Sequence, residues 1–195
     1  DPRIKAYQHS PNIGFVNGMN DAILRSDSPY IAVVGSGDTF DPTRIAKQVT
    51  VLEANPDASF CTTAAVSIDA DTGERFIDNT FSNDRIDAKD LYHSCPFTHG
   101  SIMYRRSALE RVGLYEPVFT WSSDWDLFNR LLKGSFICKS RFITAMRAWT
   151  GPVSRPRSRC CKSNSRIYCI ACVTCPPKRA RPDWTWCARK GWMLR

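Results

Sequence analysis

The apolar run Tyr-Ile-Ala-Val-Val at residues 30–34 constrains the fold of this chain more than any other feature. A strand that is apolar at every position is buried on both faces, which is typical of a parallel sheet between layers of helices. Residues 14–26 before it have apolar side chains at helical spacing, and a short strand is predicted at residues 1–7. This strand–helix–strand unit predicts an α/β fold with a mostly parallel sheet and flanking helices.

The segments after this unit continue the same pattern. Asp41-Pro42 supplies an N-cap and a first-turn proline for a helix that buries Ile45, Val49 and Leu52. Strands are predicted at residues 59–68, 74–77 and 99–104, and one or two more within residues 136–146. Helices are predicted at residues 107–112 and 124–133, each followed by a glycine that favours a helix end.

Charge and cysteine divide the chain into two parts. Residues 148–195 hold 11 of the 27 Lys and Arg residues and one of the 19 acids, which leaves residues 1–147 slightly acidic despite the formal charge of +8. Six of the nine cysteines also lie in this tail. Its mixture of Arg, Cys, Pro and Trp suits neither a solvated linker nor a core. We therefore predict one domain over residues 1–147 and interpret residues 148–195 as an irregular or disordered tail, an out-of-frame or misassembled coding end.

Two other functions for the tail stay open. The spacing Cys169-x-x-Cys172-x-x-Cys175 suits a zinc or iron–sulfur ligand set, although no second pair completes it. Arg and Lys interleaved with Trp suit binding of single-stranded nucleic acid through charge and stacking. We favour neither, and we do not expect nucleic acid to be a partner.

The remaining features bear on location. Cys61, Cys95 and Cys138 are scattered, which indicates a reducing compartment. No run approaches the ~18 apolar residues of a membrane-spanning helix, and no secretory leader is present. We expect a cytoplasmic protein and leave open a peripheral position at the inner face of the membrane.

Five stretches then occur in a set order along residues 1–147. They are Asn12-Ile13-Gly14 with Asn20 and Ala22; residues 30–34 followed by Asp38 and Pro42; Lys47-Gln48-Val49 with Leu52-Glu53-Ala54-Asn55-Pro56; residues 99–106 (His-Gly-Ser-Ile-Met-Tyr-Arg-Arg) with Gly113; and Asp124-Trp125-Asp126-Leu127 with Arg130-Leu131. This ordered set resembles the family 2 glycosyltransferases and is much more specific than any one of its members.

The resemblance implies a partial GT-A (Rossmann-like) fold, with a nucleotide-diphosphate sugar bound at the carboxyl edge of the sheet. It implies transfer of the sugar, with inversion, to a hydroxyl of a saccharide, a lipid or a protein-linked glycan. The family strands that grip the nucleotide base would precede Asp1, so we expect a fragment that is inactive without its parent chain. A protein that keeps the fold without the activity is the alternative.

In the family, the loop after the strand at residues 30–34 carries carboxylates that hold a divalent cation, Mg²⁺ or Mn²⁺, against the diphosphate. Here the loop reads Gly35-Ser36-Gly37-Asp38, so Asp38 is the one carboxylate that can serve as metal ligand. Mg²⁺ needs only one or two protein carboxylates when phosphates and waters complete its shell. Alternatively the loop N–H groups meet phosphate directly, or Asp38 caps a tight turn.

The resemblance also places Asp124 as the base that takes the proton of the acceptor hydroxyl. Acids in a first helical turn interact favourably with the helix dipole, which is the structural alternative. His99, Asn12 and Asn20 are predicted to contact the donor, or else to satisfy backbone groups. Arg105 and Arg106 are adjacent on a strand, so at most one of them points into the site.

Overall fold

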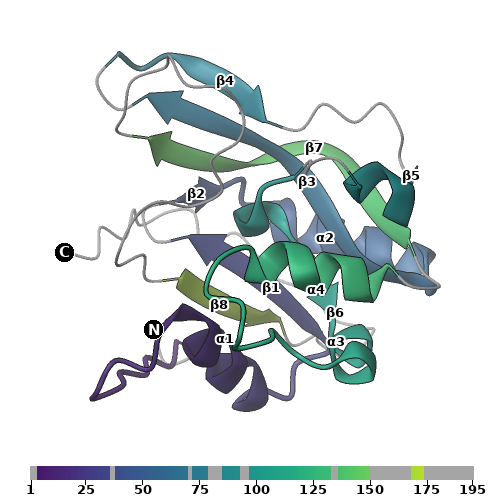
Figure 1. Ribbon diagram of the computed structural model, residues 1–195. Helices are drawn as coiled ribbons and strands as arrows, with labels where there is room; N and C mark the ends of the chain where they lie inside the picture. The colour runs from purple at the N-terminus through teal and green to yellow at the C-terminus, as the bar shows by residue number, and fades with distance from the viewer. Residues whose placement is uncertain are drawn as a thin grey trace.

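The computed structural model describes residues 4–35, 38–69, 72–78, 85–92, 97–132, 136–149 and 168–173. Their strands are β1 (Tyr30–Gly35), β2 (Thr39–Phe40), β3 (Ala58–Asp69), β4 (Arg75–Asp78), β5 (Arg85–Ile86), β6 (Met103–Arg105), β7 (Phe136–Trp149) and β8 (Tyr168–Val173). The helices are α1 (Phe15–Leu24), α2 (Arg44–Ala54), α3 (Arg106–Val112) and α4 (Ser123–Leu131), with 3-10 turns η1 (Ala88–Leu91) and η2 (His99–Ser101). The strands form one sheet in the order β2-β7-β3-β6-β1-β8, with β4 beside β3 and β5 beside β7 (Figure 1).

Strand β1 is buried at all six positions, as its apolar run predicts. Ile31 and Val33 belong to a core shared with α1, α3 and α4, whereas Tyr30 and Ala32 belong to a second core shared with α2. The sheet therefore lies between two helical layers, with α2 on the opposite face from α1, α3 and α4 (Figure 1). This arrangement confirms the α/β prediction and the helices flanking the sheet.

The prediction of a mostly parallel sheet is wrong for the described strands. Among them only β3 and β7 pair in parallel, while β1 pairs antiparallel with both β6 and β8. A strand is buried on both faces whenever helices cover both sides of the sheet, whatever the direction of its neighbours. The apolar run reported the helical layers correctly and carried no information on strand direction.

Four local predictions also differ from the structure. Residues 4–9 form no strand, and η2 occupies the first half of the strand predicted at residues 99–104. Helix α2 begins at Arg44 with Thr43 as N-cap, because the Asp41 carboxylate accepts hydrogen bonds from the backbone N–H and the hydroxyl of Thr43 and forms a turn first. Within the tail, β8 is a strand that pairs with β1.

The other predicted elements are confirmed to within one or two residues at the ends that the structure describes, except that β7 is one strand that runs three residues beyond the predicted end at residue 146. None of the helices in the described part of the chain is long and apolar enough to cross a membrane. The carboxyl end of β1 and the first turn of α4 lie at the same end of the strands, which is where the candidate site is found (Figure 1).

Candidate functional site

The carboxylate of Asp38 folds back over two glycines. Its backbone N–H donates to the Gly35 carbonyl at 3.0 Å, which closes a tight turn after β1. A Cβ atom on Gly35 would lie 2.3 Å from Oδ2 of Asp38, and one on Gly100 would lie 3.2 Å from the same oxygen. A side chain at Gly35 would therefore displace the Asp38 carboxylate, and one at Gly100 would require it to shift by a few tenths of an ångström. Ser36 and Gly37 of the predicted loop lie outside the described residues.

His99 is half-buried and begins the turn η2, one residue before the Gly100 that Asp38 overlies. Its Nε2 is 2.6 Å from the hydroxyl of Tyr115, which donates to the hydroxyl of Tyr104 at 3.1 Å. The ring of Phe15, the first residue of α1, packs edge-on against the imidazole with 6.1 Å between centroids. Burial lowers the pKa of His99, and the nearby Asp124 carboxylate opposes that shift. His99 is therefore a neutral imidazole at neutral pH, a hydrogen-bonding group rather than a cation.

Asp124 lies half-buried in the first turn of α4, close enough to His99 to act on its pKa. One of its carboxylate oxygens accepts from the N–H of Trp125 at 2.9 Å. The residue before this helix, Ser122, has φ 58°, in the left-handed region that costs a non-glycine residue roughly 1–2 kcal/mol. The chain thus turns sharply to present the first turn of α4 beside His99.

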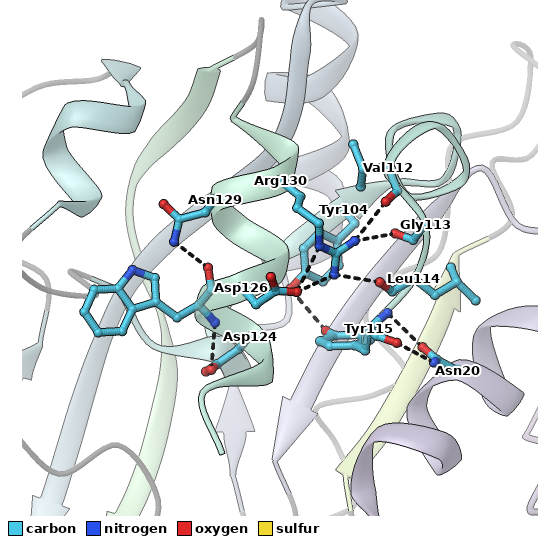
Figure 2. Close-up of polar contacts among 11 residues, drawn as sticks. Asn20, Tyr104, Val112, Gly113, Leu114, Tyr115, Asp124, Asp126, Asn129 and Arg130 are labelled. Atoms are coloured by element: carbon cyan, nitrogen blue, oxygen red, sulfur yellow. Dashed lines mark hydrogen bonds and ion pairs between the residues drawn. The ribbon is translucent and has the colours of Figure 1, made fainter. Parts of the chain in front are cut away.

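A polar clamp holds the segment that carries Tyr115 (Figure 2). Arg130 donates to the carbonyls of Val112, Gly113 and Leu114 at 2.8–3.2 Å while it pairs with Asp126 at 2.7 Å. Asp126 is therefore part of this clamp, which suits a structural role.

Asn20 completes the clamp from α1. Its amide donates to the carbonyl of Tyr115 at 2.8 Å and accepts from the N–H of the same residue at 3.0 Å (Figure 2). Asn20 therefore acts on the site through Tyr115, which in turn contacts His99. Asn12 makes a different contact, since its carboxamide oxygen accepts from the N–H of Gly14 at 2.8 Å and shapes the turn before α1.

Neither adjacent arginine is aimed at the site. Arg105 donates to the carbonyl of Leu52 at 2.7 Å, at the end of α2. Arg106 donates to the carbonyls of Ile23 and Ser28, at and beyond the end of α1. Cations at helix carboxyl ends satisfy unpaired carbonyls and complement the helix dipole. Both side chains therefore stabilise helix ends.

The structure thus brings Asp38, His99 and Asp124 to one edge of the sheet, with Asn20 linked to them through Tyr115. Sequence reasoning missed Tyr115, whose partners are remote in sequence, and Arg44, a fully buried cation at the start of α2. For Arg44 a signal existed: Arg44 and Gln48 are spaced four apart and fall in the buried stripe of Ile45 and Leu52.

A family model for glycosyl transferase family 2 matches residues 1–113, more than half of the chain. The match includes β1, the Asp38 turn and His99 but ends before α4 and Asp124. No curated protein matches the chain significantly. Because this model matches more than half of the chain, the chain belongs to glycosyl transferase family 2 and has the GT-A fold.

Proposed function

We propose that this protein transfers a sugar from a nucleotide-diphosphate sugar to an acceptor hydroxyl, with inversion at the anomeric carbon. The observation that carries the proposal is that two carboxylates lie near the turn η2. Asp38 lies over Gly100, and Asp124 acts on the pKa of the adjacent His99. One carboxylate suits the donor diphosphate and the other the acceptor. A saccharide, a lipid or a protein-linked glycan would supply the hydroxyl.

Asp124 would act as the general base. The acceptor oxygen attacks the anomeric carbon as the bond from that carbon to the diphosphate oxygen breaks. The hydroxyl proton passes to the Asp124 carboxylate, and the electron pair leaves with the nucleoside diphosphate. A positioned base contributes about 10²–10⁴-fold to such a step. His99, neutral and held by Tyr115, would orient a sugar or phosphate oxygen by hydrogen bonding.

Asp38 would supply a divalent cation with one protein ligand. No group of three or more His, Cys, Asp or Glu side chains suited to a metal occurs among the described residues. Mg²⁺ or Mn²⁺ would therefore rest mainly on diphosphate oxygens and water, with Asp38 as its protein ligand, a coordination that Mg²⁺ commonly accepts. Bound there, the cation would neutralise charge on the leaving diphosphate.

Assays of sugar transfer and of donor binding on the full-length protein distinguish the role of Asp124 as base from the role of Asp38 as metal ligand. With a panel of nucleotide-diphosphate sugars, Asp124→Asn should lower kcat by at least about 100-fold while donor Kd stays unchanged. Asp38→Asn should instead weaken Mn²⁺-dependent donor binding. The exposed Asp27→Asn is the matched control and should change neither. Full turnover in Asp124→Asn would remove Asp124 from the mechanism.

The single-carboxylate loop specifically favours a second candidate, a GT-A protein that binds donor without transferring it. That candidate predicts that the full-length protein binds donor but releases no nucleoside diphosphate with any acceptor.

Location of the protein in the cytoplasm or at the inner membrane face remains a prediction.

A further inference from the structure

Arg44 is buried completely between α2 and the sheet. Its Nη2 donates to the carbonyls of Val33 and Ile102, both at 3.2 Å, and its Nε donates to Oε1 of Gln48 at 2.9 Å. The ring of Phe40 covers the guanidinium at 5.4 Å. The side chain is therefore held in one place by contacts to β1, η2 and α2.

Burying the positive charge of Arg44 costs free energy at this position. Within the described residues Arg44 forms no ion pair shorter than 4 Å, and its Nη1 has no hydrogen-bond partner there. Burial lowers the pKa of Arg44 to about 10, against the opposing effects of Cys61 and Asp38, so the side chain stays protonated at neutral pH. It also occupies the first turn of α2, where the helix dipole disfavours a cation.

Tying the strands together does not require the charge. Gln48, one turn along α2, does the same with a neutral amide, which donates to the carbonyls of Ser101 at 2.9 Å and Cys61 at 3.4 Å. A buried ion is expensive to desolvate unless something nearby compensates it. The cross-links therefore explain the position of Arg44 but not its charge.

The position of the charge relative to the candidate site supplies a reason. Arg44 bonds Val33 and Ile102, which lie two residues before Gly35 and two residues after Gly100. These are the two glycines under the Asp38 carboxylate, and that carboxylate acts on the pKa of Arg44. The Arg44 guanidinium thus contacts the two backbone segments that carry Gly35 and Gly100 beneath the Asp38 carboxylate.

We propose that Arg44 is a buried cation that gives this turn affinity for the diphosphate of a nucleoside diphosphate. The inference rests on the proposed function and deepens it by assigning a positioning residue for the leaving group. In a loop with glycine where the family has carboxylates, fewer negative charges stand beside the phosphates, and Arg44 adds a fixed positive one in a water-poor setting. Preorganised charge of this kind stabilises developing negative charge without moving.

The test uses inorganic pyrophosphate as the probe and the full chain without metal. Calorimetric Kd and Tm are measured for wild type, Arg44→Gln, Arg44→Lys and Gln48→Met. We expect about tenfold weaker binding in Arg44→Gln and less than about threefold in Arg44→Lys. Gln48→Met, which loses cross-links but keeps the charge, should lower Tm with Kd nearly unchanged. Equal Kd in folded Arg44→Gln and wild type would overturn the proposal, as would Kd losses that simply follow Tm in all three variants.

Arg44→Lys keeps the proposal testable if Arg44→Gln fails to fold. A lysine at this buried position has a depressed pKa and loses its proton as pH rises. Its pyrophosphate affinity should therefore fall between about pH 7 and 9 relative to wild type at the same pH, and a constant ratio would refute the role of charge. Arg44-dependent pyrophosphate binding without sugar transfer would count against the proposed function alone. Transfer with pyrophosphate binding insensitive to Arg44 would count against this inference alone.

Discussion

At the scale of single residues, the site depends on what is absent as much as on what is present. Gly35 leaves room for the Asp38 carboxylate, which a side chain there would displace, and a Cβ atom on Gly100 would crowd the same carboxylate. Asp38, the carboxylate proposed to face the donor diphosphate, is visible in the sequence. The need for glycine opposite it appears only when β1 and η2 are placed side by side.

Gly35→Ala should separate folding from donor binding. The new Cβ would lie 2.3 Å from a carboxylate oxygen of Asp38, and that side chain can swing away at little cost to the fold. We expect unfolding free energy to change by less than about 1 kcal/mol, because alanine also restricts the unfolded chain. Mn²⁺-dependent binding of donor should weaken about tenfold or more, measured by calorimetry.

Gly18→Ala is the matched control for this substitution. Gly18 lies within α1, and nothing stands within 4 Å of a Cβ added there. The Gly18→Ala substitution should raise the free energy of unfolding by about 0.5–1 kcal/mol and leave donor affinity unchanged. Donor affinity unchanged in Gly35→Ala would show that the position of Asp38 does not matter for binding.

His99 should make stability depend on pH. Its pKa in the folded state is lowered by burial, so the unfolded chain takes up a proton first as pH falls below about 6.5. Unfolding free energy should therefore fall from pH 7 toward 5.5, by no more than about 1.4 kcal/mol per pH unit. Denaturant titrations at each pH measure it. His99→Gln should remove this slope, whereas His9→Gln should retain it.

At the scale of elements, Arg130 and Asn20 show how α4, α1 and the segment 112–115 become one unit. Both side chains bond backbone groups of this segment, and Arg130 also pairs with Asp126, so together they set the path of the chain (Figure 2). Their contacts span long separations in sequence, including 95 residues between Asn20 and Tyr115. Asn20 as a donor contact stays a prediction, and the geometry shows that it holds the backbone of Tyr115.

Arg130→Met should loosen this unit. The substitution removes bonds to three carbonyls and to Asp126, and since Arg130 is a quarter exposed we expect a loss of about 1–3 kcal/mol in unfolding free energy. Asp126→Asn removes only the ion pair and should cost about 0.2–1 kcal/mol. Chemical denaturation of both variants measures the difference. Equal losses would mean that the carbonyl contacts contribute little.

At the scale of the whole molecule, β8 connects the tail to the domain. It pairs with β1 along all six residues of both strands, from Tyr30 opposite Val173 to Gly35 opposite Tyr168. An unpaired edge on a strand this apolar would invite association with other chains. The tail of residues 148–195 was predicted to be irregular, and its division from residues 1–147 stays a prediction.

Truncation after Trp149 tests the contribution of β8. Removing it would expose the edge of β1, so we expect a lower Tm and concentration-dependent association in light scattering. A chain ending after Val173 keeps β8 and is the control, expected to remain as stable as the full chain. A truncated protein that stays monomeric with unchanged Tm would show that β8 contributes nothing to the domain.

Much of the fold could be predicted because it depends on local periodicity. The run at residues 30–34 and the apolar spacing of α1, α2 and α4 each report burial of a face, because apolar residue types favour burial. The buried face of α2 also holds Arg44 and Gln48, which residue type does not predict. Strand direction could not be predicted, since antiparallel and parallel neighbours bury the same side chains. The strand predicted at residues 1–7 is absent from its described part, residues 4–7, because alternation in so short a segment does not determine pairing.

The sequence by itself determined the family and the two helical layers, and it predicted Asp38, His99 and Asp124 as site residues. Only the tertiary structure decided that Asp38 lies over Gly100, that Asp124 acts on the pKa of His99, and that Tyr115 holds His99. It also decided that the charge of Arg44 lies behind the turn that carries Asp38. The physical reason is that hydrogen bonds and charge–charge effects depend on distances between segments far apart in the chain. Residue type and spacing record which groups are available, and folding sets how close they come.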